Sequence, residues 1–146
     1  MYQRGWAEGR WWRYSPRVAT HDEIQALFDR RREAWLREDT AAYLACFADD
    51  LVFASPVHDP PLAGLPAFAD LVGRSSAAMR PIAFEVHALA THGDQALAEW
   101  TITVEARAGG QRIRWRGMSV ATYRPDGRIA TWREYWNPAD LAAAAA

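Results

Sequence analysis

The pattern of hydrophobic and polar positions divides the chain into a helical first half and a strand-forming second half. Apolar residues first recur at the three- and four-residue spacing of a helix face, and from about residue 82 they lie in strand-like runs. A first helix begins after Thr20, because Thr20 and Glu23 have the spacing of a capping box. A short second helix starts at Asp39 or Thr40 and extends through Phe47. A third helix is opened by Gly64.

Each of the two longer helices has an apolar face that can pack on a sheet. These faces consist of Ile24, Leu27, Phe28 and Trp35 in the first helix, and of Phe68, Leu71, Val72 and Met79 in the third. Residues 30–32 are three consecutive arginines, and we expect them to form a solvated face. Between the second and third helices, residues 51–54 form a short apolar strand, and prolines fix residues 57–61 as a loop.

The second half predicts four antiparallel strands at residues 82–91, 95–107, 111–124 and 128–137. Turn residues separate them, including the pair Gly109–Gly110. Helices followed by a strand meander indicate an α+β fold, in which the helices cover one face of a curved sheet. We expect one domain at residues 18–138, preceded by a tryptophan-rich extension (1–17) and followed by a tail (139–146) that is a short helix or frayed.

Alternation of side chains along the strands predicts which residues share a face of the sheet. Tight turns pair Glu105 with Arg114 in one hairpin and Gly117 with Glu134 in the next. The face toward the helices then carries Trp100, Ile102, Val104, Trp115, Gly117, Ser119, Trp132, Glu134 and Trp136. The outer face carries a row of arginines that we expect to be partly paired with carboxylates.

Glu134 is the one carboxylate on this predominantly apolar face. Beside Gly117, which would leave a gap over it, and among tryptophans, its pKa is expected to rise because burial disfavours the charged form. That environment suits a general acid or base. The alternative is that Glu134 lies at the rim of the sheet or pairs with an arginine from a helix. The tryptophans likewise either fill the core or line a cavity for a flat apolar ligand.

Composition excludes several kinds of chemistry. The chain of 146 residues has a net charge of −1 and no lysine, so lysine Schiff bases and phosphate-loop lysines are excluded. The near-neutral charge also argues against nucleic-acid binding. The single Cys46 lies in an apolar stretch, and the histidines show no metal-ligand spacing. From the polar, tryptophan-rich first residues we expect no signal peptide, and no run approaches the length of a membrane span. We therefore expect a cytoplasmic protein without a metal, a cofactor or a membrane partner.

The order of several short motifs resembles the nuclear transport factor 2-like superfamily, in its SnoaL-like branch. These motifs are the helix with Trp35 and Asp39, the segment 47–53 (FADDLVF), Pro56, Gly64, the turn 126–129 (DGRI) and the segment 132–137 (WREYWN). The resemblance spans residues 22–138. It implies a cone-shaped, strongly curved antiparallel sheet packed on three N-terminal helices. It also implies a pocket inside the cone and a homodimer formed through the outer sheet face.

Relatives in this superfamily include polyketide cyclases, ketosteroid isomerase, limonene epoxide hydrolase and non-enzymatic binders, so the fold alone leaves function open. Residues 132–135 (WREY) resemble the Trp-Arg-Asp-Tyr motif of the epoxide hydrolase, which gives Glu134 an acid/base role. The hydrolase's Arg and second Asp fall at Trp100 and Ile102, and its Tyr and Asn fall at Phe53 and Ser55. Because the proton relay is lost, the resemblance does not support epoxide hydrolysis.

The hypothesis that follows is a small cofactor-independent enzyme that transfers protons on a hydrophobic aromatic or polyketide-like metabolite, by cyclisation, isomerisation or dehydration. The alternative is a non-catalytic ligand-binding or dimerisation module of the same fold. The candidate catalytic residues are Glu134, Ser119, Ser55 and His58. The candidate substrate-binding residues are Phe53, Leu71, Met79, Trp100, Ile102, Trp115, Gly117, Trp132 and Trp136.

Overall fold

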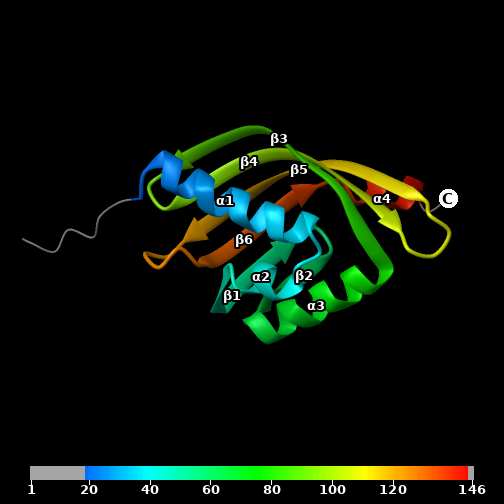
Figure 1. Cartoon of the computed structure of the whole chain (residues 1–146), viewed down its shortest axis with the longest axis horizontal. Helices are drawn as coiled ribbons and strands as arrows, with labels where there is room; N and C mark the ends of the chain where they lie inside the picture. Colours follow the sequence, from blue (N-terminus) through cyan, green and yellow to red (C-terminus); the bar gives the residue numbers. More distant parts are fainter. Residues whose placement is uncertain (1–18, 145–146) are drawn as a thin grey trace, which may run out of the picture.

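Six strands form one strongly curved sheet in the order β2-β1-β6-β5-β4-β3 (Figure 1). The computed structural model describes residues 19–144, so the predicted N-terminal extension lies outside the described residues. The strands are β1 (Phe47–Ser55), β2 (His58–Ala63), β3 (Met79–His92), β4 (Gln95–Ala106), β5 (Arg112–Tyr123) and β6 (Ile129–Trp136). The helices are α1 (His21–Leu36), α2 (Thr40–Leu44), α3 (Leu65–Ala78) and α4 (Pro138–Ala144).

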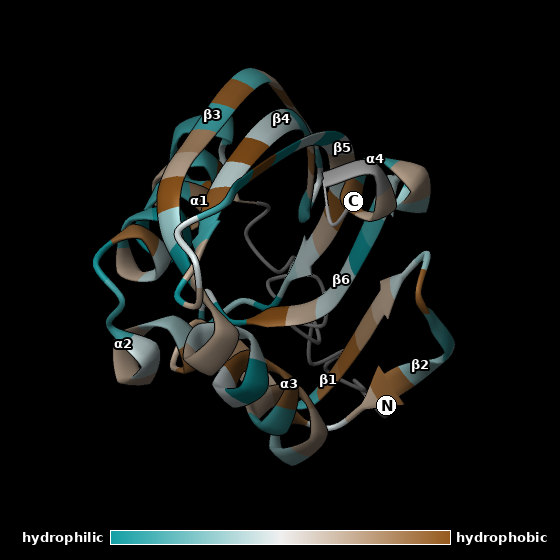
Figure 2. Cartoon of the chain, turned by 90° about the vertical axis from the view of Figure 1, so that its right-hand side faces the viewer, coloured by the Kyte–Doolittle hydropathy of each residue, from teal (hydrophilic) through white to brown (hydrophobic). Residues whose placement is uncertain are grey.

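The helices cover the inner side of the curved sheet, which confirms the α+β plan (Figure 2). Helix α1 packs on β3 and β4, α3 packs on β1, β2 and β3, and the C-terminal α4 packs on β5. The strands β3 to β6 form the expected antiparallel meander, and β1 joins β6 in parallel. No helix within residues 19–144 is long and apolar enough to cross a membrane.

The starts of α1 and α2 follow the predicted capping chemistry. The Thr20 hydroxyl accepts a hydrogen bond from the Glu23 backbone N–H, and the Glu23 carboxylate accepts one from the Thr20 N–H. Asp39 caps α2 by accepting from the Ala42 N–H. Local side-chain chemistry therefore sets where these helices begin.

The segment between α2 and α3 differs from the prediction. Helix α2 ends at Leu44, and Phe47 begins β1, because the Cys46 carbonyl accepts a hydrogen bond from the Ile129 N–H of β6. The predicted loop 57–61 is largely part of the strand β2. Its prolines are tolerated because β2 is the edge strand, where a missing N–H need not break a ladder. Met79, predicted at the end of the third helix, is the first residue of β3.

Both predicted hairpin registers are wrong by two residues. Glu105 lies opposite Arg112 rather than Arg114, because the β4–β5 turn has four loop residues with Gly109 and Gly110 at positive φ. Glu134 lies opposite Ser119 rather than Gly117. A shift of two positions preserves the parity of a strand, so the assignment of residues to the two faces is confirmed.

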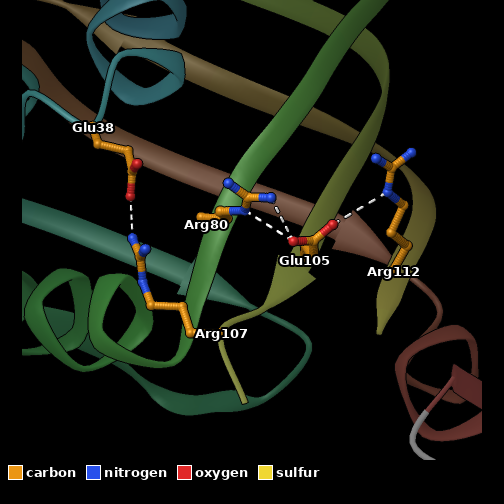
Figure 3. A network of polar contacts seen from close by, with 5 residues as sticks. All are labelled: Glu38, Arg80, Glu105, Arg107 and Arg112. Atoms are coloured by element: carbon orange, nitrogen blue, oxygen red, sulfur yellow. Dashed lines mark hydrogen bonds and ion pairs between the residues drawn. The ribbon is translucent and has the colours of Figure 1, made fainter. Parts of the chain in front are cut away.

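The outer face carries the expected arginine row, and part of it is paired. Glu105 contacts both Arg80 and Arg112, with an Arg80 Nη2–Oε1 distance of 2.6 Å (Figure 3). The hydrogen bond from Arg80 keeps the pKa of the Glu105 carboxyl below its usual value. Arg114, two positions after Arg112 in β5, lies 3.4 Å from the carboxylate of Glu85 in β3. Because these pairs are solvent-exposed, they contribute little to stability.

A pair of glycine substitutions tests how closely the interior is packed. A Cβ at position 117 would lie 2.5 Å from the buried Trp100 ring, whereas a Cβ at Gly73 of α3 would meet no atom within 4 Å. We expect Gly117→Ala to lower the free energy of unfolding by about 1–3 kcal/mol through overpacking. Gly73→Ala should raise it by up to ~1 kcal/mol through helix propensity. Urea denaturation measures both, and equal effects of the two substitutions would contradict close packing around Trp100.

Candidate active site

The Glu134 carboxylate is held by two indole N–H groups on the inner face of β6. Trp132 Nε1 donates to Glu134 Oε1 at 2.9 Å, and Trp136 Nε1 donates to Oε2 at 3.1 Å. Residues two apart on a strand point to the same side, so both tryptophans flank the carboxylate from its own strand. Each oxygen accepts one hydrogen bond and keeps a lone pair that can take a proton from a ligand.

The predicted catalytic residues lie in one row across the inner face. Ser119 of β5 is the direct cross-strand partner of Glu134. On the other side of β6, Ala54 pairs with Arg133, so the next position places Ser55 of β1 beside Glu134. Ser55 pairs in turn with His58 of β2. The four candidates therefore occupy neighbouring positions on four adjacent strands, a row that spans roughly 14 Å.

The other three candidates, like Glu134, already have hydrogen-bond partners. The Ser55 hydroxyl and His58 Nδ1 are 2.7 Å apart, and the His58 ring contacts Phe53 edge-on with centroids 5.5 Å apart. The buried Ser119 hydroxyl accepts from Trp100 Nε1 at 3.2 Å. A histidine bonded to a hydroxyl can pass a proton to or from that hydroxyl, whereas Ser119 is held in a fixed position.

The expected gap above Glu134 is absent at Gly117. Trp100 of β4 pairs with Gly117, and its indole ring lies over the glycine, where a side chain would otherwise be. The lack of a side chain at position 117 therefore makes room for Trp100 and leaves no space above the carboxylate there. The prediction that Gly117 opens a pocket over Glu134 is wrong, because the register differs by two residues.

The predicted substrate-binding residues divide between the core and its margin. Phe53, Trp100, Ile102 and Trp132 are buried in the core, while Leu71, Met79, Trp115 and Trp136 are partly buried and pack against it. Of the whole predicted set, Met79 lines a small cavity between the helices and the strands β3 and β4.

A small cavity opens between α1, α2, α3 and the strands β3 and β4. It holds about 30 Å³, which is room for one or two water molecules. Its lining comprises Ala34, Trp35, Glu38, Asp39, Thr40, Tyr43, Val72, Ser75, Ser76, Met79, Pro81 and Val104. Arg107, just beyond the end of β4, pairs with Glu38 (Figure 3). It also donates to the Ser76 carbonyl, so it links the α1–α2 connection to α3 at the rim of this cavity.

Arg31 is buried, although the sequence pattern predicted it to be exposed. Its side chain belongs to α1, and the residue is 5% exposed. The guanidinium carbon lies 3.6 Å from the centroid of the Trp132 ring, and Nη2 donates to the Tyr43 hydroxyl at 3.2 Å. The expectation that residues 30–32 form a solvated face is therefore wrong at the central position. Helical spacing could have revealed it, since Arg31 falls three residues after Phe28 and three before Ala34, on the buried side of the helix.

Two buried tyrosines lie within the electrostatic influence of Arg31. Burial raises the pKa of Tyr43, an effect that Arg31 opposes and the Glu134 charge reinforces. Burial also raises the pKa of Tyr123, again opposed by Arg31. The Tyr123 hydroxyl is buried and has no hydrogen-bond partner among the described residues. The pKa of Tyr43 therefore depends on both Arg31 and Glu134.

Sequence comparison now identifies the family. The SnoaL-like domain matches residues 24–132, which is most of the chain. The chain belongs to the SnoaL-like family. The family lies within the nuclear transport factor 2-like superfamily, so the resemblance drawn from the sequence motifs is confirmed.

Several known proteins match this SnoaL-like chain over nearly the whole of their own length. A steroid Δ-isomerase from Nocardioides simplex is 28% identical over 120 residues, which are 82% of this chain and 94% of the relative. An LEH-like epoxide hydrolase from Mycobacterium tuberculosis has a TM-score of 0.73 at 24% identity, covering 84% of this chain and 89% of that one. A Bacillus subtilis structure provisionally named an isomerase has a TM-score of 0.75 at 20% identity, covering 84% and 92%. The two structural matches establish a shared fold.

Alkaline unfolding tests the environment of the buried tyrosines. Because their pKa values are raised in the folded state, the unfolded SnoaL-like chain loses these protons first, and the free energy of unfolding should fall above pH ~10. Each such tyrosine contributes up to about 1.4 kcal/mol per pH unit. The chain has no lysine to obscure this titration. Tyr123→Phe should make the decline less steep, whereas Tyr135→Phe, at an exposed site, should not. The free energy of unfolding is measured by urea denaturation across this pH range. An equally steep decline in the wild-type protein and in Tyr123→Phe would contradict the burial argument.

Proposed function

We propose that the protein is a cofactor-independent enzyme that transfers protons on a hydrophobic ketone-type substrate, with Glu134 as the acid/base. The reaction is an isomerisation or a cyclisation, in which a proton leaves a carbon next to a carbonyl group and is returned elsewhere. The observation that carries this proposal is the Glu134 carboxylate, held at both oxygens by indole N–H groups on the inner face of the sheet.

The surroundings of Glu134 support proton transfer. A base is most effective when it is fixed in position and partly shielded from water, since bulk solvent would compete for the proton. Glu134 is half-buried, and its two indole donors restrict its rotation. The Ser55–His58 pair is available to hydrogen-bond or protonate a substrate oxygen in the same row.

The family comparisons favour the same class of reaction. The curated relative named a steroid Δ-isomerase is matched over 94% of its own length. Epoxide hydrolysis is disfavoured, because the inner-face positions 100 and 102 of β4 carry buried Trp and Ile, which supply neither a carboxylate nor a guanidinium.

Hydrogen–deuterium exchange at carbon tests this proposal without knowledge of the natural substrate. The protein is incubated in D₂O with a β,γ-unsaturated steroid ketone and with 2-tetralone, and deuterium next to the carbonyl is followed by NMR. We expect catalysed exchange that Glu134→Gln lowers at least 100-fold, the usual contribution of a general base. Glu33→Gln removes an exposed carboxylate from α1 and is the matched control, so it should leave the rate unchanged.

Three results would contradict the assignment. Exchange that Glu134→Gln leaves intact would remove Glu134 from the reaction. Equal losses in Glu134→Gln and Glu33→Gln would indicate a general structural effect. No exchange on any ketone of the panel, together with binding of those ketones, would favour the non-catalytic ligand-binding module.

We also propose that two copies associate through the outer sheet face. Met118 and Tyr135 are direct cross-strand partners there, and both are large side chains that are about half exposed. They lie beside Glu99 and Arg116 of the same face, so a second copy can bring opposite charges together around an apolar centre.

A charge placed at the centre of this face tests the association. We expect Met118→Asp to convert a dimer into a monomer, as measured by light scattering after size-exclusion chromatography, because it buries an unpaired carboxylate in the contact. Val57→Asp, at an exposed apolar site just before β2, is the control and should leave the dimer intact. A wild-type chain that is monomeric at micromolar concentration would contradict the proposal.

A further inference from the structure

Arg31 is a buried cation whose hydrogen-bonding capacity is mostly unused. Its Nε and Nη1 atoms are buried without a hydrogen-bond partner among the described residues, while Nη2 donates to the Tyr43 hydroxyl. Within residues 19–144 no carboxylate lies within ion-pair distance of this guanidinium. The neighbouring Arg32, by contrast, pairs with Asp29 at 3.4 Å. Buried charges in proteins are ordinarily paired, so Arg31 is an exception that needs a physical account.

Aromatic rings hold the guanidinium in place without saturating it. The guanidinium carbon lies 3.6 Å from the Trp132 centroid, 5.3 Å from that of Tyr43, 5.8 Å from that of Phe84 and 6.0 Å from that of Phe47. Cation–π contacts attract the charge to the ring faces but satisfy none of the in-plane N–H donors. The result is a fixed cation in apolar surroundings whose N–H groups remain available to an acceptor.

We infer that Arg31 binds the carboxylate group of an aromatic ligand. An acceptor that approaches this site meets one positive charge, two free guanidinium nitrogens and the Tyr43 hydroxyl. A carboxylate matches a guanidinium in charge and in planar geometry. A phosphate dianion would leave its second charge and further oxygens uncompensated among the rings, and a neutral carbonyl would leave the positive charge unpaired. The surrounding rings fit a flat aromatic body.

The site adjoins both the cavity and Glu134. Tyr43 lines the cavity and accepts from Arg31, so its side chain separates the guanidinium from the cavity, and the inference requires a ligand to displace the Tyr43 ring. The ring belongs to α2, a helix of five residues. On the other side, the Trp132 indole that stacks on Arg31 donates its N–H to Glu134. As a statement about the substrate, the inference rests on the proposed function, because it places the carboxylate of the substrate at Arg31 while Glu134 acts on a neighbouring carbon. Binding itself requires no chemistry at Glu134.

Paired ligands of the same shape test the site in the full chain. Benzoate and benzamide differ chiefly in charge, and their dissociation constants are measured by protein NMR titration. We expect benzoate to bind at least tenfold more tightly than benzamide to the wild-type protein. Arg31→Met keeps an unbranched apolar side chain but removes the cation, and it should abolish that preference. Arg30→Met removes an exposed arginine from the preceding position and should leave the preference intact.

A second measurement needs only the wild-type protein and therefore holds even if Arg31→Met does not fold. The Nε–H resonance of Arg31, assigned through its scalar couplings to the Arg31 side-chain carbons, should shift downfield on addition of benzoate and stay in place on addition of benzamide. No preference for benzoate, a preference that survives in Arg31→Met, or an unmoved Nε–H resonance at saturating benzoate would each overturn the inference.

Glu134→Gln separates this inference from the proposed function. That variant should lose catalysed exchange but keep the tenfold preference for benzoate. A protein that loses exchange in Glu134→Gln but shows no benzoate preference retains the proposed function without the Arg31 site. A protein that binds benzoate through Arg31 but exchanges no ketone retains the Arg31 site without the proposed function.

Discussion

The buried indole of Trp132 is the contact on which the interior of this protein depends. One percent of the residue is exposed. Its ring stacks on Phe28 of α1 at 5.8 Å and underlies the Arg31 guanidinium at 3.6 Å, while its N–H is bonded to Glu134. A single side chain of β6 therefore fixes the position of α1 against the sheet and the orientation of the central carboxylate. A smaller residue at this position would leave a cavity beneath the helix and free both charged groups.

Trp132 also explains how two opposite charges share an apolar interior without forming an ion pair. Arg31 rests on the ring face, which is electron-rich, and Glu134 accepts from the ring edge, which is electron-poor. Each charge is thereby partly stabilised while its remaining hydrogen-bonding capacity stays open. A direct salt bridge would neutralise both groups and leave neither available to a ligand. The arrangement is costly for stability, and such costs are typical of functional sites.

The turns decide which residues face one another across the sheet. With the glycines 109 and 110 at positive φ, the β4–β5 loop has four residues, and the cross-strand partner of Trp100 becomes Gly117. This pairing lets the indole lie flat over a residue without a side chain, and in the next hairpin it is Ser119 that stands beside Glu134. The interior is consequently filled by Trp100 where a gap above the carboxylate was expected, and a small cavity lies beside α1, α2 and α3.

The sequence alone determined the α+β plan, the capped starts of α1 and α2, the two faces of the meander and the position of Glu134 on the inner face. These features depend on local chemistry or on the parity of a strand, which a register shift of two residues leaves unchanged. Only the tertiary structure decided which residues contact one another. The prolines after Ser55 form a strand because they lie at a sheet edge. Strand pairing places Ser55 and His58 in the same row as Glu134. Arg31 is buried because Trp132 and Tyr43 surround that turn of α1. Contacts between residues that are distant in the chain depend on where the elements pack, and no local pattern encodes that.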